Sequence, residues 1–146
     1  MRSHEGFSLI ELLIVVAVIG IIAAIAVPNL LQSKAAANEA SAIASVRSLV
    51  TSQITFAATT GNGLYGSLAE LQTAGLIDGV LGSGTKDGYN YAVPTGDGSA
   101  TNFTITATPV TFGTTGYRGF FSDVSGVIRY TTTGAAPTAA SPALGQ

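Results

Sequence analysis

The chain has no cysteine, a single histidine and few charged side chains. Its 146 residues include 6 Lys and Arg and 8 Asp and Glu, for a formal net charge of −2. Without cysteine no disulfide can staple the fold, although this absence does not place the chain in a reducing compartment. Without a block of Lys or Arg there is no surface to neutralise a run of phosphates, so the sequence carries no electrostatic sign of nucleic-acid binding.

What the chain does contain is a long apolar run near its start, HEGFSLIELLIVVAVIGIIAAIAVP, at residues 4–28. Within residues 7–27 the polar side chains are Ser8 and Glu11. About 21 residues of helix extend roughly 32 Å, close to the thickness of the hydrocarbon core of a bilayer. The run is therefore long enough to cross a membrane.

Three interpretations of this run stay open from the residues alone. The first is a cleaved secretory signal, because AIA at residues 24–26 resembles a cleavage site, although the run is long for a signal core and one Arg precedes it. The second is a plain membrane anchor, which leaves Glu11 unexplained. The third makes Glu11 the functional centre, because a carboxylate at membrane depth costs roughly 2–3.5 kcal/mol unless a partner compensates it.

A second helical pattern follows directly, over residues 29–58. The apolar residues that recur there at three- and four-residue steps are Ile43, Val46, Val50, Ile54 and Ala57. This spacing indicates one face of an α-helix, with Ser45 and Ser52 off the stripe. It predicts that the apolar helix continues without a loop into an amphipathic helix, which would pack on a sheet through Ile43, Val46, Val50 and Ile54.

The remainder of the chain has the patterns of a short helix and a small sheet. Ser67 and Glu70 have capping-box spacing, and Gly75 is placed to end a short helix. The segments with period-two alternation lie at residues 89–93, 102–109, 117–123 and 127–131. They predict three or four antiparallel strands with one apolar face, which the helical stripe would cover. Residues 132–146 have little to bury and are expected to be a flexible tail.

The opening stretch resembles the N-terminal signature of type IV pilins and of the related pseudopilins of type II secretion. The resemblance depends on a Gly-Phe junction, a glutamate shortly after it, an uninterrupted apolar helix and a proline at its end. It implies that residues 1–6 are a leader, that prepilin peptidase cuts after Gly6, and that the new N-terminus, Phe7, is N-methylated. It implies further that residues 7–28 form a transmembrane and assembly helix and residues 29–146 the globular head.

The implied fold is the α+β pilin fold, a long N-terminal helix packed on a small antiparallel sheet. The implied function is a structural subunit, not an enzyme, that leaves the inner membrane to join an extracellular pilus filament. The partners are then other copies of the chain, prepilin peptidase, the inner-membrane assembly machinery and, before assembly, the lipid bilayer. Adhesion, twitching motility and DNA uptake are properties of the whole fibre among which the sequence does not choose.

No cofactor, metal ion or small-molecule substrate is expected. His4, the one histidine, would be lost with the leader, which removes Ser-His catalysis and His-based metal sites. Major pseudopilins tend to carry a calcium-binding loop near the C-terminus. Asp87, Asp97 and Asp123 are scattered and lack the spacing of such a loop, so within the resemblance a pilus is favoured over a secretion pseudopilus. A pseudopilin and a secreted soluble domain remain the alternatives.

Three sites carry further hypotheses. Glu11 would be neutralised by the amine of Phe7 on the next subunit; the alternative is that Glu11 is paired within its own chain or reaches the membrane interface. Between Gly20 and Pro28 the helix is expected either to unwind locally in a filament or merely to bend, since Pro28 removes one backbone hydrogen bond. Asn102, in NFT, fits the N-glycosylation pattern, a tripeptide that is common by chance.

Overall fold

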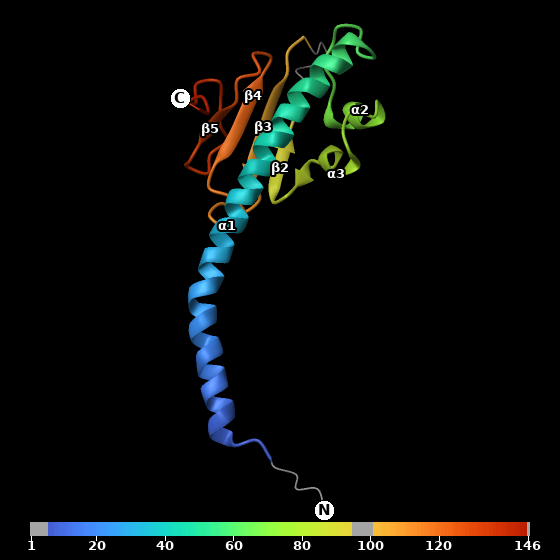
Figure 1. The fold of residues 1–146 in the computed structure, drawn as a ribbon. Helices are drawn as coiled ribbons and strands as arrows, with labels where there is room; N and C mark the ends of the chain where they lie inside the picture. Colours follow the sequence, from blue (N-terminus) through green and yellow to red (C-terminus); the bar gives the residue numbers. More distant parts are fainter. Residues whose placement is uncertain (1–5, 95–100, 146) are drawn as a thin grey trace, which may run out of the picture. The chain divides into compact units, whose positions relative to one another are not determined.

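The computed structural model describes residues 6–94 and 101–145, and the chain divides into two compact units, Met1–Ser33 and Lys34–Gln146 (Figure 1). Residues 1–5 of the expected leader, residues 95–100 with Asp97, and the last residue of the expected tail lie outside the described residues. Helix α1, Leu9–Ala58, is a single helix of 50 residues that contributes to both units. The continuous helix predicted from the sequence is therefore observed. We call the second unit the head.

The part of α1 in the first unit is helical throughout, including Gly20 and Pro28. The side chain of Asn29 donates a hydrogen bond to the carbonyl of Ile25 (3.0 Å), next to the position where Pro28 offers no N–H. The segment between Gly20 and Pro28 is thus wound in this structure. Its unwinding in a filament stays a prediction.

The head contains an antiparallel sheet of five strands in the order β1-β2-β3-β4-β5. The strands are β1 (Thr85–Lys86), β2 (Tyr89–Ala92), β3 (Thr104–Pro109), β4 (Gly119–Asp123) and β5 (Arg129–Thr131). Four of them lie within the segments predicted from period-two alternation, and the α+β fold is confirmed. The additional strand, β1, has two residues and is too short to show a period.

The head portion of α1 lies across one face of this sheet (Figure 1). The core includes Val46, Leu49 and Phe56 from α1, packed with Tyr89, Phe103, Ile105 and Phe120 from the sheet region. Ile43 and Val50 are half-buried and pack against this core. The expected packing role of Ile54 is wrong, because its side chain is 56% exposed.

The buried face of α1 includes polar residues that the hydrophobic pattern placed outside it. Ser45, Ser52 and Gln53 are all buried. Ser52 donates to the carbonyl of Leu76 (3.1 Å), and Gln53 exchanges two hydrogen bonds with the backbone of Gly66 (2.5 and 2.9 Å). These bonds compensate the burial of polar groups, so the true face is rotated relative to the apolar stripe.

This rotation makes a paired prediction about Val46 and Ile54. Val46→Ala removes two buried methyl groups and should lower the free energy of unfolding by about 2 kcal/mol. Ile54→Ala should change it by less than about 0.5 kcal/mol, because the side chain is exposed. Denaturant unfolding of the full chain in detergent measures both. Equal decreases in the free energy of unfolding for the two variants would contradict the rotated face and support the stripe predicted from the sequence, in which Ile54 is buried.

Two short helices connect α1 to the sheet: α2 (Leu68–Thr73) and α3 (Gly79–Gly82). The capping box predicted for Ser67 and Glu70 is confirmed, since the N–H of Ser67 donates to the carboxylate of Glu70 (2.7 Å) and Ser67 Oγ accepts from the N–H of Glu70 (3.4 Å). The hydrogen bonds from Ser67 lower the pKa of Glu70. Gly75 follows α2 with a φ of 72°, the left-handed conformation that ends a helix.

The segment from Thr132 to Gly145 folds back along β5. The N–H of Tyr130 donates to the carbonyl of Pro142 (3.0 Å), and the N–H of Leu144 donates to the carbonyl of Ile128 (2.7 Å). The side chain of Arg129 adds a bond to the carbonyl of Ser141 (2.9 Å). These contacts differ from the expected flexible tail; they arise from backbone pairing at a sheet edge, which a run of small residues does not reveal.

Candidate assembly site

Glu11 lies in the first turn of α1, where its carboxylate accepts a hydrogen bond from the backbone N–H of Ser8 (2.9 Å). A negative charge in this position is also favoured by the helix dipole. The contact is the own-chain pairing that the sequence left open for Glu11. A carboxylate accepts more than one hydrogen bond, so this single bond leaves capacity for a further donor.

The contact between Ser8 and Glu11 has a signal in the sequence. Ser8 and Glu11 have the same S-x-x-E spacing as Ser67 and Glu70, yet a capping box was predicted only for the second pair. At Ser8 only the half formed by the glutamate side chain is present among the described residues. Glu11 therefore has a local structural role in addition to any role in assembly.

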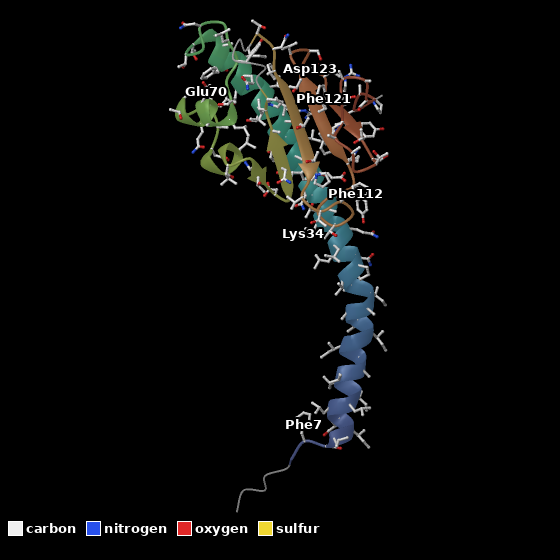
Figure 2. All side chains as sticks on the ribbon, turned by 180° about the vertical axis from the view of Figure 1, so that it is seen from behind. Phe7, Lys34, Glu70, Phe112, Phe121 and Asp123 are labelled. Atoms are coloured by element: carbon white, nitrogen blue, oxygen red, sulfur yellow. The ribbon has the colours of Figure 1, made fainter. Side chains whose placement is uncertain are left out.

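Gly6 and Phe7 precede the helix and are open to solvent. The side chain of Phe7 is 84% exposed, and Figure 2 shows it at the start of the ribbon of α1. No heavy atom lies within 4 Å of the position that a Cβ on Gly6 would occupy. The peptide bond between these residues is thus sterically accessible to an enzyme.

Residues 6–34 are all exposed, and most of them are large apolar side chains. Within the part of the chain that the structure describes, α1 is the one helix whose length and composition would allow it to cross a membrane. A helix that is apolar on every side requires an apolar environment, either lipid or other helices. Ala17, Gly20, Ala23 and Ala24 provide small residues where a second helix could approach closely.

Glu39 forms an ionic contact between α1 and the loop before β4 that the sequence did not predict. One of its oxygens accepts from the backbone N–H groups of Tyr117 (2.8 Å) and Arg118 (3.1 Å). The other accepts from Arg118 Nε (2.7 Å), although the two residues are 79 positions apart. The side chain of Glu39 is buried, and Arg118 lies at its solvent edge. This contact fixes the loop before β4 to the first turns of α1 in the head.

The remaining candidates are apart from one another. Asp87 bonds to Ser41 and Asp123 to Ser125, each in a separate contact. Within residues 6–94 and 101–145, no three His, Cys, Asp or Glu side chains gather as they would around a metal ion. Asn102 is exposed just before β3, and its glycosylation stays a prediction.

Comparison with known proteins bears on the N-terminal segment. The model of the prokaryotic N-terminal methylation motif matches residues 1–27. Over 53 residues the chain is 47% identical to the type IV major pilin protein PilA of Myxococcus xanthus. The matched segment covers 36% of this chain and 24% of that protein. The N-terminal segment of the chain is thus similar to that of a type IV pilin and carries the N-terminal methylation motif.

Other relatives match over similar lengths. The chain is 56% identical over 39 residues to the type IV wide pilus major component PilA4 of Thermus thermophilus, covering 27% of this chain and 30% of that protein. It is 41% identical over 49 residues to the type II secretion system core protein G of Vibrio cholerae, covering 34% of each. These matches span between a quarter and a third of each relative's length. No solved structure matches the chain significantly.

Proposed function

We propose that this chain is a structural subunit of a type IV pilus, cleaved after Gly6 and polymerised through its N-terminal helix into an extracellular filament. The observation that carries the proposal is the position of Glu11, the one carboxylate of a helix segment that is otherwise apolar and exposed over its whole length. The match of residues 1–27 to the N-terminal methylation motif supports cleavage at the junction of Gly6 and Phe7 and methylation of Phe7.

The chemistry of assembly follows from that cleavage. Hydrolysis of the amide bond after Gly6 gives Phe7 a positively charged α-amino group. When this amine meets Glu11 of a neighbouring subunit, two charges that are costly in an apolar environment compensate each other. The contact joins two different surfaces, so it need not close into a ring and propagates as a helical filament. Before assembly, the same helix would hold the chain in the inner membrane.

A secretion pseudopilus is the second candidate, favoured by the likeness to core protein G of Vibrio cholerae. We prefer the pilus because a major pseudopilin is expected to carry a calcium-binding loop. The described aspartates, Asp87 and Asp123, instead form separate hydrogen bonds with Ser41 and Ser125 and do not form such a loop together. Electron microscopy of cells that express the chain distinguishes the two, because a pilus predicts long surface fibres that react with antibody to the head. Adhesion, motility and DNA uptake then require separate assays of fibre-bearing cells.

Cleavage after Gly6 makes a prediction that intact-mass measurement tests. Gly6→Leu should leave the six-residue leader attached and filaments absent, because a bulky residue would block the peptidase. The space around Gly6 is open, so the substitution should not disturb the fold. Ser8→Ala, which keeps the backbone N–H bonded to Glu11, is the control and should be processed normally. A mature mass for Gly6→Leu would contradict the proposal, and an N-terminus at Val27 would indicate a secretory signal instead.

A further inference from the structure

Phe112 and Tyr117 form an exposed aromatic pair on the loop between β3 and β4. Their side chains are 49% and 47% exposed, and the rings meet edge to face with centroids 6.3 Å apart. We call this pair the aromatic knob. Single exposed apolar residues are ordinary on a protein surface, whereas two adjacent aromatic rings resemble the anchors of protein interfaces.

Hydrogen bonds hold the backbone of the knob loop on both sides of the aromatic pair. Within its loop, the N–H of Gly113 donates to the carbonyl of Gly116 (2.9 Å), and the N–H of Thr115 donates to the carbonyl of Thr111 (2.9 Å). The side chain of Asn38 on α1 bonds to the carbonyl of Thr115 (2.9 Å), and Glu39 holds the backbone at Tyr117. A rigid aromatic surface loses little conformational entropy on binding, so it is preorganised for a partner.

A hollow of about 480 Å³ lies between the last turns of α1 and α2. Its walls are formed by Phe56, Thr60, Ala69, Glu70, Thr73 and Ala74. We call it the α2 groove. Its volume is within the range of pockets that bind compact apolar groups. Phe56 and the alanines provide an apolar surface, and Glu70 places a carboxylate at the groove.

The knob and the α2 groove lie at opposite ends of the head. The knob loop contacts α1 at Asn38, and the groove begins at Phe56, about 18 residues or roughly 27 Å further along the helix. Figure 2 shows Phe112 at the Lys34 end of the head and Glu70 at the other. The two surfaces cannot meet within one chain, and a contact between two copies would be of the open, repeating kind.

The charges at the two ends are complementary. Lys34 is exposed one turn of α1 before Asn38, and Figure 2 labels it at the same end of the head as Phe112. Glu70 lies at the groove, where its side chain is exposed and Ser67 donates to one of its carboxylate oxygens. A knob that enters the groove of another copy would bring an ammonium group toward a carboxylate. Opposite charges in such an arrangement favour this partner and this orientation.

We propose that the aromatic knob of one subunit inserts into the α2 groove of another copy of this chain, so that heads stack end to end in the filament. The inference rests on the proposed function, because the filament is what aligns the two heads. It assigns the head a contact separate from the one between N-terminal helices. The rings of Phe112 and Tyr117 would be exposed before assembly and buried after it.

Engineered cysteines test this contact in filaments of the full chain. The native chain has no cysteine, so any disulfide must come from the introduced residues. Phe112→Cys combined with Thr73→Cys places one thiol in the knob and one in the groove, and oxidised filaments should give a ladder of multimers on a non-reducing gel. The control pair, Phe112→Cys with Ile54→Cys, should give no ladder, because Ile54 lies on the opposite side of α1 from Phe56.

A second measurement covers the case in which paired cysteines themselves prevent growth. Phe112→Ala should lower the yield of sheared filaments about tenfold, as expected for loss of an aromatic anchor. Val80→Ala, at a residue that is 57% exposed and outside both surfaces, should not lower it. Filaments without a ladder, or equal yields for the two alanine variants, would overturn the head contact and leave the pilus intact. Absence of filaments from the unaltered chain would overturn both proposals.

Discussion

Glu11→Leu is expected to leave the chain inserted in the inner membrane and to abolish filament growth. The substitution makes the helix more apolar, so insertion should not suffer. In the proposed filament it removes the acceptor for the Phe7 amine of the neighbouring subunit, and loss of one partner from a buried ion pair costs about 3–5 kcal/mol. Repeated at every subunit, that loss corresponds to a decrease in affinity of on the order of a hundredfold or more. Membrane fractionation and recovery of sheared filaments measure the two effects separately.

Glu11→Gln separates the proposed assembly role of Glu11 from the local role seen in the structure. A glutamine can still accept the hydrogen bond from the N–H of Ser8, because Gln substitutes for Glu in a capping box. It carries no charge, so it should fail to neutralise an amine, and filaments should be lost as in Glu11→Leu. Normal filaments from Glu11→Gln would mean that the helix start, not charge compensation, is what the residue supplies.

Glu39→Ala is expected to lower the free energy of unfolding of the head by about 3–5 kcal/mol. The substitution leaves the N–H groups of Tyr117 and Arg118 without their acceptor and removes the partner of the guanidinium group. Because Arg118 is partly exposed and regains water, the cost comes mainly from the two part-buried backbone donors. Denaturant unfolding of the full chain in detergent, followed by tyrosine fluorescence, measures it.

Arg47→Ala is the control for this second prediction. Arg47 is also a charged residue of α1, but it is exposed, so its loss should change the free energy of unfolding by less than about 0.5 kcal/mol. Glu39→Gln keeps an acceptor for one or two of the donors and should fall between the two variants. If Glu39→Ala and Arg47→Ala lowered the free energy of unfolding by the same small amount, the contacts of Glu39 would not contribute measurably to stability.

The parts of the fold that were predicted are those that depend on local periodicity. The run through residues 7–27 and the period of two from Tyr89 onward are properties of neighbouring residues, and they correctly indicated a long helix and an antiparallel sheet. The capping box at Ser67 and Glu70 is likewise a relation across three residues.

The parts that were not predicted depend on contacts between distant residues. Nothing in the sequence pairs Glu39 with Arg118, 79 positions away. Gln53 is polar, and its burial depends on hydrogen bonds with the backbone of Gly66, a contact that local sequence does not indicate. The stripe read from apolar residues therefore included Ile54, which is exposed, and missed the polar residues that complete the buried face.

The candidate site was predictable for a different reason. Glu11 is conspicuous in the sequence because a carboxylate is costly among apolar residues, so its presence there requires a partner that compensates it. Its bond to Ser8 shows that part of this compensation is local. The aromatic knob and the α2 groove had no such signal, since nothing in the sequence shows which aromatic side chains are exposed or which of them line a groove.

The most direct test is the density of purified filaments around the carboxylate of Glu11. The account predicts that the N-methylated amine of Phe7 from a neighbouring subunit lies within about 4 Å of that carboxylate, the separation of an ion pair. A carboxylate that instead contacts only the Ser8 backbone or the Phe7 amine of its own chain would contradict it.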